Sequence, residues 1–182
     1  LPVSGEDVLP DDADAYYNGV AYNYNEKLIN ILLIGVDREK PGASDKHQAD
    51  SLFLISLDSG KKSVNVISIS RNTLCNVDSY DINGNYFATE KQQLCLAYTY
   101  GNDDKRSSEL TVKAVSDFLY GIPIGGYYTV FMNSVKDIVN AVGGVPVSIT
   151  EDMTSANPAF KAGSQITVKG DNALEYLRFR GE

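Results

Sequence analysis

Apolar residues gather in short runs along the first part of the chain, and each run has the length of a β-strand. Residues 28–36 read LINILLIGV, a near-continuous apolar run that is typical of a central strand buried on both faces. Residues 51–58 and 63–70 are two further runs, joined by the short polar turn DSGKK. So short a connection predicts that these two strands form an antiparallel hairpin.

The third run ends in a way that calls for an explanation. It reads as a buried strand, and its apolar residues are Val64, Val66, Ile67 and Ile69. Arg71, Asn72 and Thr73 follow directly after it. Arginine is common where strands reach the surface, so this ending can be ordinary. The alternative is that Arg71 is held at the edge of a sheet to meet an anion.

The second part of the chain favours helices. Four segments are predicted helices from their apolar spacing: residues 92–100, 107–120, 134–142 and 171–179. Asn133 can cap the third helix, and Gly121 can end the second. Residues 126–131 and 145–150 read as short strands, and Asn83-Gly84 indicates a β-hairpin excursion after the third strand. The pattern predicts an α/β fold with a mixed central sheet sandwiched by helices.

The composition fits one globular domain that follows a loose N-terminal arm. The 182 residues are 43% hydrophobic and 22% charged, which is ordinary globular composition. Residues 1–26 are acidic, then tyrosine-rich, and we expect an N-terminal arm ahead of a domain at 27–182. The net charge of −8 argues against a nucleic-acid binder with a basic face. It does not exclude a phosphate ligand, because a few arginines can set the local potential.

Several other classes of site have little support. His47 is the only histidine, so a Ser-His-Asp triad or a histidine-rich metal site is disfavoured. Cys75 and Cys95 match neither a zinc ribbon nor a redox CxxC. One cysteine pair fits either an exported protein with a single disulfide or a reduced cytosolic protein. No apolar run reaches the roughly 18 residues of a membrane span.

Four charged residues are predicted to meet at one edge of the sheet. Asp37 and Arg38 follow the first strand, Asp50 precedes the second, and Arg71 follows the third. Because strands two and three form a hairpin, the start of one lies near the end of the other. Ligands of α/β sheets bind at such edges. The alternative is an ordinary surface cluster of ion pairs.

The chemistry of this group points to phosphate. Two carboxylates can hold a hard divalent cation such as Mg²⁺, and arginine forks match phosphate oxygens. Carboxylates, arginines and a cation are together the parts needed for phosphoryl transfer.

Several motifs in order along the chain resemble the LytR-CpsA-Psr family. They cover about residues 30–180 and read NILLIGVDR, VNVISISRNTL, AYTYG, GIPIGGYYTVFM, VKDIVNAVGGVPVSI and ALEYLRFR. The resemblance implies an α/β domain outside a bacterial cell, anchored by an N-terminal transmembrane helix that is not in this chain. It implies a transferase that moves a phosphoglycan, such as teichoic acid or capsule, from a polyprenyl-pyrophosphate carrier onto cell-wall peptidoglycan.

The resemblance also implies roles for single residues. Asp37, Asp50 and Arg71 are the implied catalytic residues, and Asp37 and Asp50 the implied ligands of Mg²⁺ or Mn²⁺. The implied pyrophosphate-binding residues are Arg38, Arg71, Arg178 and Arg180. An oxidising exterior implies a disulfide between Cys75 and Cys95.

The chain departs from the family pattern in three places. Gln48 stands where the family usually has an arginine, and Asn72 where it usually has an aspartate. The resemblance also implies that a C-terminal part of the family's domain, with a further arginine-rich helix, is missing. These departures motivate two alternatives, a non-catalytic module that binds lipid-linked phosphates or wall glycan, and a polyprenyl-pyrophosphate pyrophosphatase.

Overall fold

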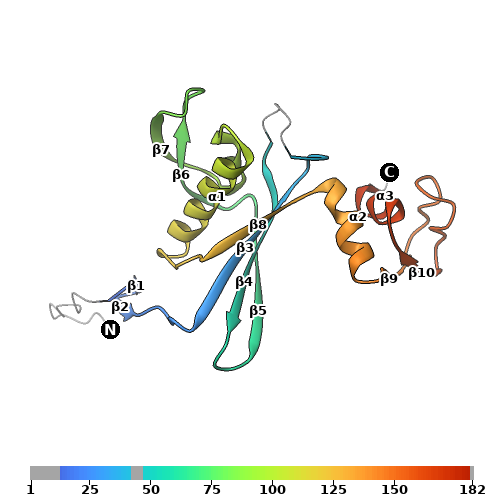
Figure 1. Ribbon diagram of the computed structural model, residues 1–182, viewed down its shortest axis with the longest axis horizontal. Helices are drawn as coiled ribbons and strands as arrows, with labels where there is room; N and C mark the ends of the chain where they lie inside the picture. The colour runs from blue at the N-terminus through green and yellow to red at the C-terminus, as the bar shows by residue number, and fades with distance from the viewer. Residues whose placement is uncertain (1–12, 42–46, 181–182) are drawn as a thin grey trace. The chain divides into compact units, whose positions relative to one another are not determined.

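The computed structural model describes residues 13–41 and 47–180 (Figure 1). The chain divides into two compact units. The first comprises Leu1–Ile34 and Gln48–Tyr128, and the second comprises Gly35–His47 and Thr129–Glu182. Within the described ranges, no helix is long and apolar enough to cross a membrane.

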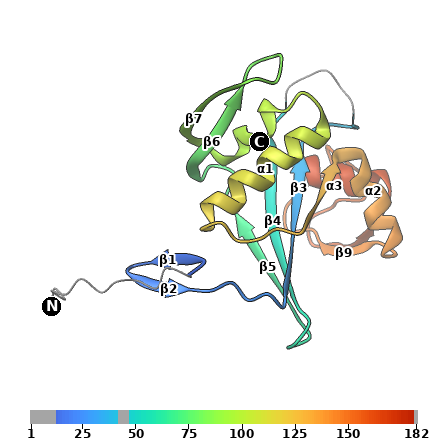
Figure 2. The same ribbon diagram turned by 60° about the vertical axis from the view of Figure 1, so that its left-hand side comes forward.

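Four strands form the central sheet. They are β3 (Leu28–Val36), β4 (Ala49–Asp58), β5 (Ser63–Ile69) and β8 (Gly126–Phe131). Their order is β5-β4-β3-β8, and β4 and β5 are antiparallel with Leu52 opposite Ile69. Figure 2 shows β3 and β5 pointing in the same direction. The predicted α/β class with a mixed central sheet is confirmed, and so is the hairpin of the second and third predicted strands.

The central strand β3 is buried on one face more than on the other. Leu32 and Ile34 are fully buried, whereas Ile29 is 53% exposed. The residues of β3 alternate between buried and partly exposed positions. The prediction of a strand buried on both faces was therefore wrong, because an apolar run does not reveal how completely each face of a strand is covered.

The strand β5 departs furthest from its prediction. Val64 and Val66 are each 62% exposed, and Ile69 is its only buried residue. The reason lies in its position, since β5 is the outer strand of the sheet and has β4 as its hydrogen-bonded neighbour. The prediction of a buried third strand was wrong, because apolar sequence does not distinguish an edge strand from an inner one.

Two helical segments cover part of the sheet in the first unit. The 3₁₀ helix η1 (Leu94–Tyr100) packs against β4, and α1 (Asp104–Phe118) packs against η1. The side chain of Asp103 caps α1 by accepting a hydrogen bond of 2.7 Å from the amide of Arg106. This cap explains why α1 begins before the predicted residue 107. Gly121 has a φ of +81° and donates its amide to Ser116, which ends the helix as predicted.

Two β-hairpins complete the first unit. The antiparallel pair β6 (Leu74–Tyr80) and β7 (Tyr86–Gln93) is the predicted excursion after the third strand. A second pair, β1 (Ala15–Tyr17) and β2 (Val20–Tyr22), lies within the predicted N-terminal arm. The arm is therefore partly structured, and the division of the chain at residue 26 stays a prediction.

The second unit has its own core. Its elements are α2 (Met132–Ala141), β9 (Val145–Ser148), β10 (Gln165–Val168) and α3 (Asp171–Arg178). The buried residues that form this core are Ile149, Met153, Phe160, Val168 and Ala173. Strand β10 was not predicted, because its four residues, QITV, alternate over too short a length to stand out.

The start of α2 is hydrogen-bonded to the segment that follows β3. The amide of Met132 donates to the carbonyl of Arg38 at 2.9 Å, and the amide of Asn133 donates to the carbonyl of Glu39 at 3.1 Å. Asn133 thus lies inside the helix, and Phe131 is the N-cap residue without a side-chain cap. The predicted Asn133 cap was wrong, because main-chain carbonyls from a distant segment satisfy these amides instead.

Candidate functional site

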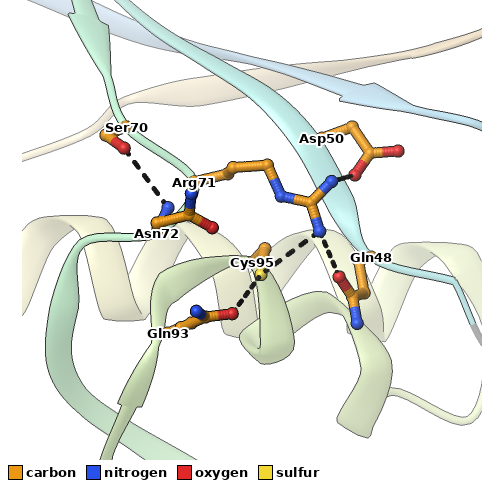
Figure 3. Close-up of polar contacts among 7 residues, drawn as sticks. All are labelled: Gln48, Asp50, Ser70, Arg71, Asn72, Gln93 and Cys95. Atoms are coloured by element: carbon orange, nitrogen blue, oxygen red, sulfur yellow. Dashed lines mark hydrogen bonds and ion pairs between the residues drawn. The ribbon is translucent and has the colours of Figure 1, made fainter.

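Arg71 is held between two side chains at the edge of the sheet (Figure 3). Its Nη1 donates to Oδ1 of Asp50 in an ion pair, and its Nη2 donates to Oε1 of Gln48. The side chain of Arg71 is 38% exposed and that of Asp50 is 34% exposed. The guanidinium therefore has a defined position while part of it faces solvent.

The register of the β4–β5 hairpin explains this meeting. Leu52 lies opposite Ile69, so continuing the ladder by two residues brings Asp50 opposite Arg71. The structure thus brings together Asp50 and Arg71, as the sequence pattern predicts. Their catalytic and binding roles stay predictions.

Gln48 has a use that the sequence did not reveal. The resemblance makes it a position with a missing positive charge, but in the structure its amide oxygen is an acceptor for Arg71. Asn72 behaves differently. Its backbone amide donates to Oγ of Ser70 at 3.3 Å, and Figure 3 marks no interaction between Asn72 and the guanidinium of Arg71.

Asp37 and Arg38 follow β3 and belong to the second unit. Asp37 is exposed. Arg38 is only 8% exposed, and its guanidinium carbon lies 4.9 Å from the centroid of the Phe131 ring. This stacking against an aromatic face stabilises a buried cation. A joint site of these two residues with Asp50 and Arg71 stays a prediction.

Arg178 and Arg180 lie at the end of α3 and make different contacts. Nη2 of Arg178 is 3.8 Å from Oε1 of Glu39. Nη1 of Arg180 donates to the carbonyls of Leu177 and Phe179, both at 2.9 Å. Arg180 therefore neutralises the C-terminal end of α3, a common role for a cation there.

Arg178 also lines a pocket of about 380 Å³ in the second unit. The lining residues are Ala156, Asp171, Leu174, Glu175, Arg178 and Phe179. The helix has ended by Phe179, whose φ and ψ are −58° and 132°. The two arginines are therefore not constrained to opposite sides of one helix. Their binding of pyrophosphate stays a prediction.

Asp50 is the carboxylate that contacts Arg71, and it could also meet a cation. The described part of the chain contains no group of three or more His, Cys, Asp or Glu residues that could hold a metal ion. Asp50 uses Oδ1 for Arg71, and its side chain is 34% exposed. Mg²⁺ is commonly bound by one or two carboxylates together with substrate phosphates and water. Asp50 fits that role, with Asp37 as the second predicted ligand.

The predicted disulfide is not formed in the structure. Cys75 and Cys95 are both free and buried. Cys75 lies opposite Gln92 in the β6–β7 ladder, and Cys95, three residues further along the chain, donates its amide to the carbonyl of Arg71 at 3.1 Å. Burial raises the pKa of the Cys75 thiol, and the charge of Asp117 raises it further.

The chain is similar to known proteins in sequence and in fold. The LytR_cpsA_psr family model matches residues 9–182. The polyisoprenyl-teichoic acid–peptidoglycan teichoic acid transferase TagU of Bacillus mycoides is 32% identical over 154 residues, which are 85% of this chain and 45% of that protein. The transferase of the same description called TagV, from Bacillus subtilis, is 31% identical over 162 residues, 85% of this chain and 38% of that protein.

A solved structure matches as well. The crystal structure of B. subtilis TagV aligns with a TM-score of 0.61 at 26% identity, covering 86% of this chain and 57% of that chain. This chain spans less than half the length of the two curated relatives. With the family model matched over nearly all of its residues, the chain belongs to the LytR-CpsA-Psr family.

Proposed function

We propose that this chain carries the donor-binding part of a transferase that moves a phosphoglycan from a polyprenyl-pyrophosphate carrier onto peptidoglycan. The observation that carries the proposal is the guanidinium of Arg71, held by Asp50 and Gln48 at the end of β5. The names of TagU and TagV describe transfer of teichoic acid from a polyisoprenyl carrier to peptidoglycan. Those names support the choice of donor and acceptor.

The hydrogen bonds of Arg71 leave donors for phosphate. A guanidinium has five N–H donors. Nη1 gives one to Asp50, and Nη2 gives one to Gln48 and directs one at the sulfur of Cys95. The remaining donors belong to a side chain that is 38% exposed. A held arginine with spare donors suits the oxygens of a pyrophosphate.

The outer strand β5 carries exposed apolar residues, which support a binding surface for the lipid. Val64 lies opposite Leu57 and Val66 opposite Ile55, so these four apolar residues share one face of the hairpin. Val64 and Val66 are each 62% exposed. Side chains alternate along a strand, so Asp50 and Arg71 lie on the other face of the hairpin. We propose that the polyprenyl chain lies against the exposed valines and passes the end of β5, where its pyrophosphate meets the guanidinium.

The ion pair of Arg71 with Asp50 supports a role for a divalent cation. The pair is neutral as a whole, and a bare carboxylate repels a pyrophosphate. Mg²⁺ or Mn²⁺ bound by Asp50, and by Asp37, would neutralise the charge of the phosphates and orient them. The residues of this chain would hold the cation and the non-bridging oxygens in place.

The proposed reaction exchanges one P–O bond for another. A hydroxyl of peptidoglycan attacks the phosphorus that bears the glycan, a new P–O bond forms, and the P–O bond to the polyprenyl phosphate breaks. Polyprenyl phosphate leaves, and the proton of the hydroxyl passes to a carboxylate. Asp37 is the exposed candidate for this acceptor. The interaction with arginine stabilises the charge of the phosphates during the transfer.

We also propose that the protein acts at the outer face of the cytoplasmic membrane, next to the cell wall. This placement follows from the substrates, because lipid-linked glycan and peptidoglycan meet there. An N-terminal membrane anchor outside this chain is part of the same proposal.

A second candidate function rests on Gln48. It contributes a neutral amide to Arg71 where the family usually has a further arginine, so the first unit has one positive charge fewer at this edge. A module that binds the lipid-linked phosphate without turnover is the alternative that this difference favours. A pyrophosphatase that passes the phosphoryl group to water is the related third case.

One labelled donor separates these cases. The chain is incubated with Mg²⁺, a polyprenyl-pyrophosphate glycan labelled in the glycan, and peptidoglycan fragments. Labelled peptidoglycan together with released polyprenyl phosphate supports the transferase, provided that the Arg71→Ala variant lacks both. Polyprenyl phosphate without labelled peptidoglycan indicates the pyrophosphatase, and a bound but unchanged donor indicates the binding module.

A further inference from the structure

Cys95 contacts Arg71 twice. Its backbone amide donates to the carbonyl of Arg71 at 3.1 Å, and its Sγ lies 3.8 Å from Nη2 of the same residue. Cys95 is the second residue of η1 and is fully buried. Figure 3 shows its sulfur beside the end of the guanidinium that also meets Gln48. The main chain and the side chain of Arg71 are thus both touched by one cysteine.

The thiol lies between two polar groups whose hydrogen-bonding roles are complementary. The sulfur accepts from Nη2 of Arg71, and its S–H is directed at Oε1 of Gln93 at 3.9 Å. A thiol is a weak donor and a weak acceptor, so it can serve both groups at once. The result is a row of side chains from Gln93 through Cys95 to Arg71, continued by Gln48.

We infer that Cys95 is a positioning residue for Arg71, and that its free thiol helps to aim the guanidinium at the pyrophosphate. The inference rests on the proposed function, because it assumes that Arg71 binds the donor. Without the sulfur, Nη2 would lose one of its two partners, and the guanidinium would occupy more orientations. A group that touches a ligand depends on such support for its exact orientation.

An ordinary buried cysteine would act differently. It would stabilise the fold by packing, and its removal would change the free energy of unfolding without a specific effect on Arg71. The two roles are therefore separated by coupling between residues 95 and 71, which a double-mutant cycle measures.

The experiment uses the full chain and farnesyl pyrophosphate as the probe, with Mg²⁺ present, and measures Kd by calorimetry. Cys95→Ala should weaken binding by about 3- to 10-fold, the range of one ordinary hydrogen bond. In an Arg71→Ala background the same change should have no further effect. Cys75→Ala is the matched control, since Cys75 is also a buried cysteine but makes no hydrogen bond to Arg71 in the described structure.

A second variant changes a residue that lies outside the core. Gln93 is exposed, so Gln93→Ala should fold normally, and it should weaken binding by a smaller factor, about 2-fold, because it acts through the thiol. An equal effect of Cys95→Ala in both backgrounds, or no effect on Kd, overturns the inference while the proposed function stands. If Arg71→Ala itself leaves Kd unchanged, the proposed function and this inference both fall.

Discussion

Gln48 accepts a hydrogen bond from Nη2 of Arg71 through its side-chain oxygen. Asp50 takes Nη1 of the same guanidinium, so the arginine is fixed by one charged and one neutral partner. The neutral partner holds the side chain without cancelling more of its charge. An arginine held in this way is suited to an anionic ligand that approaches from solvent.

Replacing Arg71 should weaken donor binding and leave the fold intact. Arg71→Ala removes a charge-assisted hydrogen bond to the donor, which is expected to be worth roughly 1.5–3 kcal/mol, about 10- to 100-fold in Kd. Titration with a polyprenyl-pyrophosphate analogue measures the change, and circular dichroism checks the fold. Arg106→Ala is the control, because Arg106 stacks on Tyr80 at 4.9 Å and does not contact Arg71. Unchanged affinity of Arg71→Ala would refute the assigned role.

Gln48 should matter for binding although it carries no charge. Gln48→Met keeps the shape of the side chain and removes the acceptor for Nη2, which should cost about 0.5–1.5 kcal/mol of binding. Gln92→Met is the matched control, because Gln92 accepts from the hydroxyl of Tyr100 instead. Asn72→Ala should have no effect, since the contact of Asn72 in Figure 3 is made by its backbone amide with Ser70 and not with the guanidinium. A loss in Asn72→Ala equal to that in Gln48→Met would contradict this account.

Removing a carboxylate should reduce the dependence of donor binding on divalent metal. We expect Asp50→Asn and Asp37→Asn each to lower the stimulation of binding by Mg²⁺ by at least about 5-fold, because a metal loses one of its few protein ligands. Titrations with Mg²⁺ and with EDTA measure the change.

Asp50→Asn also loosens Arg71, so Gln48→Met provides the comparison. It loosens Arg71 without removing a carboxylate, and it should keep the full response to Mg²⁺. Asp50→Asn that responds to Mg²⁺ as strongly as the parent would rule out Asp50 as a ligand.

The stability of the first unit should depend on pH through Asp78. Its carboxylate accepts a 2.6 Å hydrogen bond from Oγ1 of Thr89 and lies 3.1 Å from Nζ of Lys113. The hydrogen bond from Thr89 is the largest cause that lowers the pKa of Asp78, and Lys113 adds to it. A lowered folded pKa means that the stabilisation is present above the ordinary value of about 3.9 and is lost as pH falls through the folded pKa.

Asp78→Asn tests this dependence. It should lower the free energy of unfolding at pH 7 by about 1–2 kcal/mol, and its difference from the parent should shrink as pH falls below about 3.9. Urea unfolding at neutral and acidic pH gives both values. Glu109→Gln is the control, because its 3.8 Å pair with Lys105 is exposed and should contribute little. A difference that persists undiminished in acid would show that the charge of Asp78 is not the cause.

Local patterns in the sequence were enough to predict most helices and strands of the fold. Residues 28–36 and 126–131 are strands with the predicted bounds, and the turn at residues 58–62 joins an antiparallel hairpin. That hairpin also explains why the meeting of Asp50 and Arg71 could be predicted. Turn length alone brings the start of one strand to the end of the other.

The features that the sequence did not predict depend on the packing of distant segments. The exposure of Val64 and Val66 follows from the outer position of β5, which no local pattern reveals. The approach of Cys95 to Arg71 needs the turn of η1 toward the end of β5. Gln48 was read only as an absent charge, because an amide becomes an acceptor for Arg71 only when the geometry is known.

The outer position of β5 also bears on how molecules of this protein behave toward one another. An outer strand with Val64, Val66 and Ile67 exposed offers a surface on which a strand from another molecule can pair. Lys61 and Lys62, just before β5, place positive charges where two such strands would meet. Salt screens these charges over about 8–10 Å at ordinary ionic strength. The lysines beside this strand therefore oppose self-association, and more effectively in dilute salt than in concentrated salt.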